Sequence, residues 1–122
     1  MPPKKFSFHS RIKSFYYAWA GVRKFIRDEH NTWIHAVATI GVIVAARVLE
    51  VSYMEAIALT IVIALVWITE MLNTCVERMA DCISLEERPD IKYIKDLAAA
   101  AVLVAALAAV ITGLFIFIPK II

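Results

Sequence analysis

Residues 56–69 contain no charged side chain, and this apolar run ends abruptly at Glu70. Such a run predicts a helix that crosses a lipid bilayer, because about 20 apolar residues span the roughly 30 Å of hydrocarbon. The composition agrees, since 61% of the 122 residues are hydrophobic, more than an ordinary soluble protein of this size contains. We therefore expect a single all-α domain, residues 1–122, that is integral to a membrane.

Basic residues alternate along the chain in a way that predicts three spans and their orientation. Seven Lys and Arg residues precede the first uncharged run, whereas the turn at residues 50–55 has none and the next loop region has four. Under the positive-inside rule, this distribution places the N-terminus and the second loop in the cytoplasm. The N-terminus has no apolar core of signal-peptide length, so we expect no cleaved segment. A net charge of only +2 argues against a nucleic-acid partner.

Apolar periodicity and helix breakers set the expected elements. Residues 7–27 predict an amphipathic helix with interleaved aromatic and basic side chains, typical of a helix that lies in the lipid headgroup layer. The spans are expected at residues 32–50, 55–84 and 91–118. The second helix is longer than the hydrocarbon requires, so it should extend into the cytoplasmic interface, and Pro89 should break the helix because it disfavours helical backbone at Arg88. The alanine-rich third span suits close packing and an oligomer.

Glu70 begins a stripe of polar residues at the end of the second span. Asn73, Glu77 and Asp81 follow at +3, +7 and +11, which places all four on one helix face. Carboxylates at this depth are costly unless they are paired, hydrated or bound to a cation, so the stripe is a functional-site hypothesis. The alternative is that the helix leaves the bilayer here and its polar face is simply solvated.

The residue types on the stripe favour magnesium and phosphoryl transfer. Carboxylate oxygens suit Mg²⁺, which uses one or two carboxylates together with substrate phosphates and waters. Lys95, expected at about the depth of Glu77, would neutralise charge on a transferring phosphoryl group, and a partly buried glutamate could accept a proton from an alcohol. The sequence has no glycine-rich phosphate-binding loop and no Glu-x-x-His pair of a di-iron site. Cys75 and Cys82 lack zinc-site spacing and are expected to be reduced packing residues.

Other interpretations of these residues stay open at this point. A small ion-coupled membrane transporter would use Glu70 as its carrier carboxylate, because a membrane glutamate can also carry protons. A non-catalytic membrane scaffold would need no chemistry on the stripe. Glu29 could be an acid near a helix start, His35 a hydrogen-bonded residue at the interface, and Arg47 a cation whose side chain reaches the outer interface.

The second and third spans share a long pattern of fixed spacing. It reads Glu70-x-x-Asn73-Thr74-x-x-Glu77-x-x-x-Asp81, followed by Lys95-Asp96 and an alanine run. Over nearly the whole chain, this resembles the small prokaryotic diacylglycerol kinase and undecaprenol kinase family. The resemblance implies a lipid kinase of the bacterial inner (cytoplasmic) membrane, a homotrimer with active sites shared between protomers. It also implies Mg²⁺ as cofactor and ATP as the donor of a γ-phosphoryl group to the primary hydroxyl of a membrane lipid alcohol.

Carried over by position, the resemblance gives roles to single residues. Glu70 looks like the catalytic base that deprotonates the lipid hydroxyl, with Asn73 as a polar organiser beside it. Glu77 together with Glu29 resembles the magnesium pair. The positions that resemble the family's nucleotide contacts are Tyr17, Glu86, Glu87, Arg88, Lys95 and Asp96.

Two features of the N-terminal region bear on the branch of the family. Residues 14–21 and 29–35 look more like the undecaprenol kinase branch, so we expect undecaprenol rather than diacylglycerol as acceptor. An arginine that the diacylglycerol kinases carry near the start of the surface helix is displaced here. Ser10 stands at that register, and Arg11 follows it.

Overall fold

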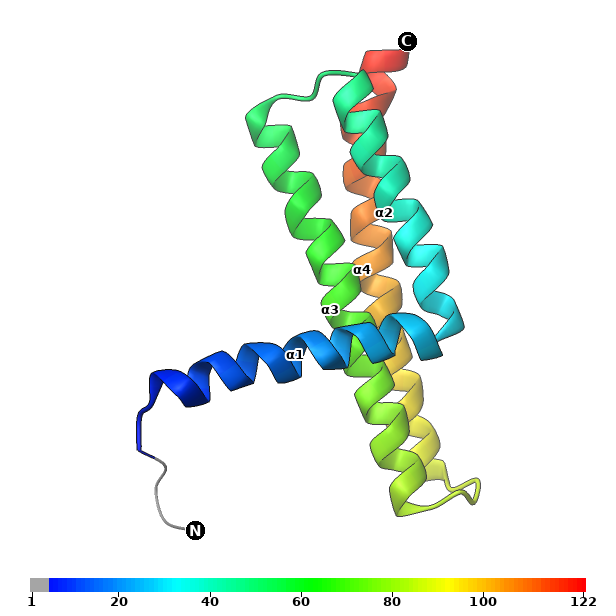
Figure 1. The fold of residues 1–122 in the computed structure, drawn as a ribbon. Coiled ribbons are helices and arrows are strands. Elements are labelled where there is room, and N and C mark those ends of the chain that lie inside the picture. The colour runs from blue at the N-terminus through cyan, green and yellow to red at the C-terminus, as the bar shows by residue number, and fades with distance from the viewer. Residues whose placement is uncertain (1–4) are drawn as a thin grey trace. The chain divides into compact units, whose positions relative to one another are not determined.

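A computed structural model describes residues 5–122, and residues 1–4 of the predicted domain lie outside this description. Within 5–122 the regular structure is helical, with the elements α1 (Phe8–Asp28), α2 (His30–Val48), α3 (Tyr53–Ile83) and α4 (Pro89–Ile121) (Figure 1). The last three helices are each long and apolar enough to cross a membrane. The predicted all-α class with three spans is therefore confirmed. The chain divides into two compact units, Met1–Ala38 and Thr39–Ile122.

In the first unit, α1 and the start of α2 are joined by local hydrogen bonds. The Ser7 hydroxyl caps α1 by accepting a hydrogen bond from the Ser10 amide at 3.4 Å. The helix ends where Glu29 adopts an extended backbone, with φ −103° and ψ 117°. The Thr32 hydroxyl then donates to the Phe25 carbonyl at 3.3 Å, which ties the first turn of α2 to the last turn of α1.

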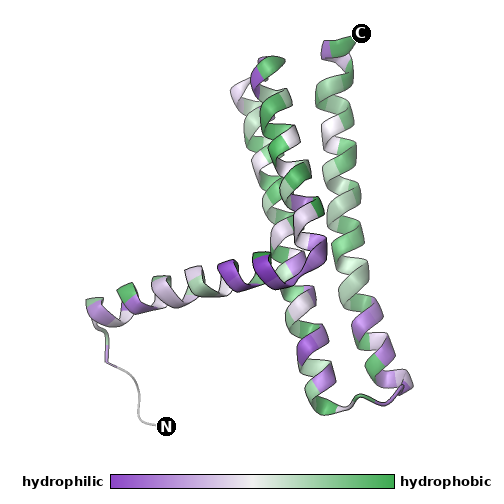
Figure 2. Cartoon of the chain, turned by 45° about the vertical axis from the view of Figure 1, so that its right-hand side comes forward, coloured by the Kyte–Doolittle hydropathy of each residue, from purple (hydrophilic) through white to green (hydrophobic). Residues whose placement is uncertain are grey.

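In the second unit, α3 and α4 form an antiparallel hairpin through the loop at residues 84–88 (Figure 1). Its core side chains are mostly aliphatic: Leu59, Ala80, Ile91, Ala105 and Ile116 are buried. The small alanines let the two backbones approach closely, which is how helices attract each other in lipid. Polar segments of α3 and α4 gather toward the loop that joins them, while the rest of both helices is apolar (Figure 2).

The far end of this hairpin is fixed by a cap and an ion pair. The Ser52 hydroxyl accepts a hydrogen bond from the Glu55 amide at 3.2 Å, and the Glu55 carboxylate accepts one from the Ser52 amide at 2.8 Å, forming a capping box. The Lys120 ammonium lies 3.0 Å from the same carboxylate. These contacts tie the end of α4 to the start of α3.

The helix ends differ from the predicted bounds by one to three residues, and three of these differences have a clear local reason. α3 begins at Tyr53 rather than residue 55, because Ser52 caps it. α4 begins at Pro89 rather than residue 91, since proline suits the first position of a helix, and Arg88 before it is extended as predicted. α2 ends at Val48 rather than residue 50, because Glu50 adopts a left-handed backbone with φ 53°.

The two cysteines do not lie in the core of the single chain. Cys75 and Cys82 are free thiols, and both side chains are exposed on α3. The expected packing role does not agree with their exposure in the single chain. Seven residues separate them, which places them on the outer side of α3 about two turns apart.

Candidate active site

Most of the predicted site residues lie at the polar end of the α3–α4 hairpin. The last turns of α3 carry Glu70, Asn73 and Glu77, and the first turns of α4 carry Lys95 and Asp96. Because the two helices are antiparallel neighbours, the end of α3 lies beside the start of α4. The fold therefore brings residues about 20 positions apart in sequence to one end of the hairpin.

Glu70, Asn73 and Glu77 follow one face of α3 from a buried to an exposed position. The Glu70 side chain is buried, with 7% of the residue exposed, whereas Glu77 is exposed. The Asn73 amide nitrogen donates to a Glu77 carboxylate oxygen at 3.3 Å. The Asn73 carbonyl oxygen is buried and has no hydrogen-bond partner among residues 5–122. Because buried polar atoms are normally satisfied, this oxygen marks a place where a donor or a cation fits.

The donor set on this face fits Mg²⁺. Glu77 supplies a carboxylate and Asn73 a carbonyl oxygen, and hard oxygen atoms of this kind are the ligands that Mg²⁺ prefers. Within the described chain, no three His, Cys, Asp or Glu side chains gather into a metal cluster. A magnesium site bound through one or two carboxylates together with substrate phosphates needs no such cluster.

An ion pair joins the two helices at the same end. The Lys95 ammonium donates to the Asp81 carboxylate at 2.7 Å, and the two side chains are 37% and 50% exposed. Asp96, which the resemblance groups with Lys95, instead accepts a hydrogen bond from Lys92 one turn earlier. Sequence reasoning placed Asp81 on the polar stripe but gave it no role in the site. The structure adds it as the residue that holds Lys95.

A cleft of about 460 Å³ lies at the loop between α3 and α4. Five of the six predicted nucleotide contacts line it: Glu86, Glu87, Arg88, Lys95 and Asp96. The volume is in the range of small-molecule sites, and guanidinium and ammonium groups are the usual partners of phosphate oxygens. Arg88 is held by Asp90 at 2.8 Å, so one of these cations has a defined position.

The remaining predicted residues, Tyr17 and Glu29, belong to the first unit. Tyr17 is exposed on α1, and its ring meets the Tyr16 ring edge to face at 5.9 Å. Glu29 is half-buried at the end of α1. The pairing of Glu29 with Glu77 on magnesium, and the stacking of Tyr17 on adenine, stay predictions.

Comparison with known proteins decides the family. The sequence profile of the prokaryotic diacylglycerol kinases matches residues 16–117. The chain belongs to this family. It is therefore a lipid kinase, and membership implies ATP as phosphate donor and a lipid alcohol as acceptor. The three apolar helices agree with a membrane kinase, and the transporter alternative is not favoured.

Some relatives of this kinase are named undecaprenol kinase and others diacylglycerol kinase. It is 37% identical to the undecaprenol kinase of Bacillus subtilis over 109 residues, which cover 89% of each chain. It is 38% identical to a diacylglycerol kinase of Synechocystis over 109 residues, which cover 88% of the present chain and 62% of the Synechocystis protein. It is 35% identical to the diacylglycerol kinase of Escherichia coli K12 over 83% of each chain. The identities to the two kinds of kinase lie close together, between 35% and 38%.

Proposed function

We propose that this kinase transfers the γ-phosphoryl group of Mg-ATP to the primary hydroxyl of undecaprenol, with diacylglycerol as the second candidate. The undecaprenol kinase of Bacillus subtilis supports this choice, because the similarity covers 89% of both chains. The resemblance of residues 14–21 and 29–35 to that branch points the same way. We further propose that it is a homotrimer in the bacterial inner membrane with its N-terminus in the cytoplasm and α1 on the membrane surface.

The observation that carries the proposal is the order of groups along one end of the hairpin. Glu70 is buried where the uncharged run of α3 ends, so it lies at a depth that a lipid hydroxyl can reach. Lys95 and the cleft at the loop lie farther from the apolar part of the hairpin, where a water-soluble nucleotide can bind. The two substrates would therefore approach this site from opposite sides, lipid from the hydrocarbon and ATP from water.

The chemistry follows from this arrangement. Glu70 accepts the proton of the lipid hydroxyl, and the hydroxyl oxygen forms a bond to the γ-phosphorus as the bond from this phosphorus to the leaving oxygen of ADP breaks. Lys95 and Arg88 bind phosphate oxygens and hold the γ-phosphoryl group in line. Glu77 and Glu29 would hold the metal ion, with the unpartnered Asn73 oxygen nearby. When bound, Mg²⁺ supplies positive charge to the β- and γ-phosphate oxygens.

The large apolar surface of the single chain supports the proposed trimer. Beyond the few buried side chains of the α3–α4 hairpin, most of the large apolar residues on α2, α3 and α4 are exposed. Lipid covers part of this surface, and close packing of alanine-rich faces such as that of α4 is the usual attraction between helices in a membrane. A site completed by a neighbouring protomer would also bring Glu29 of one copy to Glu77 of another.

The test is ADP release by the purified protein in detergent micelles, with Mg²⁺ and with undecaprenol or diacylglycerol offered separately. We expect turnover with undecaprenol, and a loss of about 10²- to 10⁴-fold in Glu70→Gln, because general-base catalysis contributes an effect of that size. Glu50→Gln, which removes a carboxylate at the other end of the spans, is the matched control and should keep full turnover. Faster turnover with diacylglycerol would overturn the choice of acceptor, and full activity in Glu70→Gln would remove the assigned base.

A further inference from the structure

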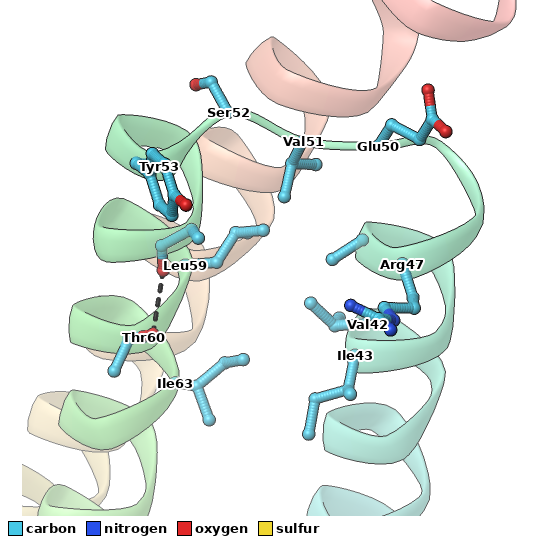
Figure 3. A pocket seen from close by; sticks show the side chains of 12 residues that line it. Val42, Ile43, Arg47, Glu50, Val51, Ser52, Tyr53, Leu59, Thr60 and Ile63 are labelled. Atoms are coloured by element: carbon cyan, nitrogen blue, oxygen red, sulfur yellow. Dashed lines mark hydrogen bonds between the residues drawn. The ribbon is translucent and has the colours of Figure 1, made fainter.

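A second cavity lies at the end of α3 that is farthest from the candidate active site. It occupies about 780 Å³ between the last turns of α2 and the first turns of α3 (Figure 3). The turn at residues 49–52 closes it at the end of the spans. None of the residues assigned to phosphoryl transfer lines it. It is therefore a separate site, and what it binds does not depend on the proposed function.

The walls of this groove are apolar and its mouth is polar. Aliphatic side chains form the walls: Val42, Ile43, Ala46, Ala56, Leu59 and Ile63. Arg47, Ser52 and Tyr53 lie toward the turn that joins the two helices. This order of an apolar slot below a cationic and hydroxyl-bearing mouth matches the order of acyl chain and headgroup in a phospholipid.

Arg47 is the residue of the groove that favours an anionic ligand. Its guanidinium lies on the side of α2 that faces α3 (Figure 3). In the described part of the chain, residues 5–122, no ion pair or hydrogen bond of this side chain is found. Neither nearby acid pairs with it in the described chain: Lys120 and the Ser52 amide hold Glu55, and Glu50, which also lines the groove, makes no ion pair with Arg47. Arg47 is exposed and lies one residue from the end of α2, so its guanidinium can extend to the interface, where lipid phosphates lie.

We propose that this groove binds one anionic phospholipid, with its phosphate on Arg47 and an acyl chain along the apolar walls. Guanidinium is the side chain best matched to phosphate oxygens, and the volume is within the range of small-molecule sites. A free phosphate ion would leave the apolar walls exposed. A helix from a second copy would also cover the walls, and the test below separates it from a lipid. A phospholipid satisfies both parts of the groove together.

The test is native mass spectrometry of the full chain released from micelles, with phosphatidylglycerol or inorganic phosphate as the probe. The wild-type protein should retain phosphatidylglycerol and not inorganic phosphate. Arg47→Gln should weaken retention about tenfold or more, because a hydrogen bond to a charged partner is lost. Ala56→Phe, which fills the groove but keeps the arginine, should weaken it to a similar extent. Glu50→Gln, which keeps the arginine and removes a carboxylate that lines the groove, is the control and should retain the lipid at least as well as the wild type.

The same spectra separate the other occupants. Equal lipid retention in Arg47→Gln and wild type overturns the proposal. So does retention of inorganic phosphate that Ala56→Phe leaves unchanged, since this would indicate a simple anion site. Loss of the oligomer in Ala56→Phe with unchanged lipid retention would show that a second copy fills the groove. The mass of the intact assembly also reports whether each variant folds, so a negative result in Arg47→Gln remains interpretable.

Discussion

Replacing Asp81 with asparagine tests whether the Asp81–Lys95 ion pair supports stability or catalysis. The change keeps the shape of the side chain and removes the charge that lies 2.7 Å from the Lys95 ammonium. Because the two side chains are 50% and 37% exposed, the pair resembles surface ion pairs, which contribute about 0–1 kcal/mol. We therefore expect the free energy of unfolding to fall by less than about 1 kcal/mol.

The kinetic effect should be larger than the effect on stability. Without Asp81, the Lys95 side chain regains rotamer freedom, which for lysine amounts to about 1.5–2 kcal/mol. If the nucleotide must then order this side chain, kcat/KM for ATP falls by about 10- to 30-fold, since about 1.4 kcal/mol corresponds to tenfold. Lys95→Met removes the phosphate contact itself and should cost more, on the order of 10²- to 10³-fold.

The assay is ADP release at varied ATP for four proteins: wild type, Asp81→Asn, Lys95→Met and the double variant. If Asp81 acts by positioning Lys95, the Asp81 change has no further effect once Lys95 is methionine. Lys120→Met is the matched control, because it breaks an ion pair with a 3.0 Å separation at the other end of the hairpin and should leave kcat/KM unchanged. Additive effects in the double variant would refute the positioning role. A rise of kcat/KM in Asp81→Asn would show instead that Asp81 competes with phosphate for Lys95.

Two further substitutions test the fold. Ser52→Ala should lower the free energy of unfolding by about 1 kcal/mol, because the capping box is lost, whereas Ser52→Thr should keep it; denaturant titration followed by circular dichroism would measure both. Ala105→Phe should lower the free energy of unfolding by about 1–3 kcal/mol or more in the same titration, because Ala105 is buried in the α3–α4 hairpin. Ala101→Phe, at an exposed alanine of α4, is the control and should lower it less. An equal loss in both variants would contradict this packing.

Features with a local cause could be predicted from the sequence. Three long apolar segments, with the charged loops between them, predict three spans, and Pro89 predicts the break before α4 through its effect on Arg88. The 3.6-residue period also places Glu70, Asn73 and Glu77 on one face of α3, and the hydrogen bond between Asn73 and Glu77 agrees with that placement. The start of α3 could have been read as well, because Ser-x-x-Glu at Ser52 is a capping-box pattern.

Features that depend on helix register could not be predicted in this way. α4 is apolar around most of its circumference, so its pattern does not indicate which side faces α3 or how far the two helices are shifted along each other. For this reason neither the partner of Asp81 nor the pairing of Lys120 with Glu55 could be predicted. Arg47 could be placed near the end of a span, but not on the side of α2 that lines a groove.

The two ion pairs agree on the register of the hairpin. On α3, Glu55 and Asp81 are 26 residues apart, which corresponds to about 39 Å along the helix. On α4, Lys95 and Lys120 are 25 residues apart, which corresponds to about 38 Å. The spacings match, so one antiparallel register forms both pairs, and a shift by one turn would break both. Each spacing exceeds the roughly 30 Å of hydrocarbon, so the pairs can lie at opposite interfaces. Glu70 is 11 residues, or about 16 Å, from Asp81 toward the apolar part of α3. A register held in this way would keep the proposed base on the lipid side of Lys95, as transfer from a water-soluble nucleotide to a lipid alcohol requires.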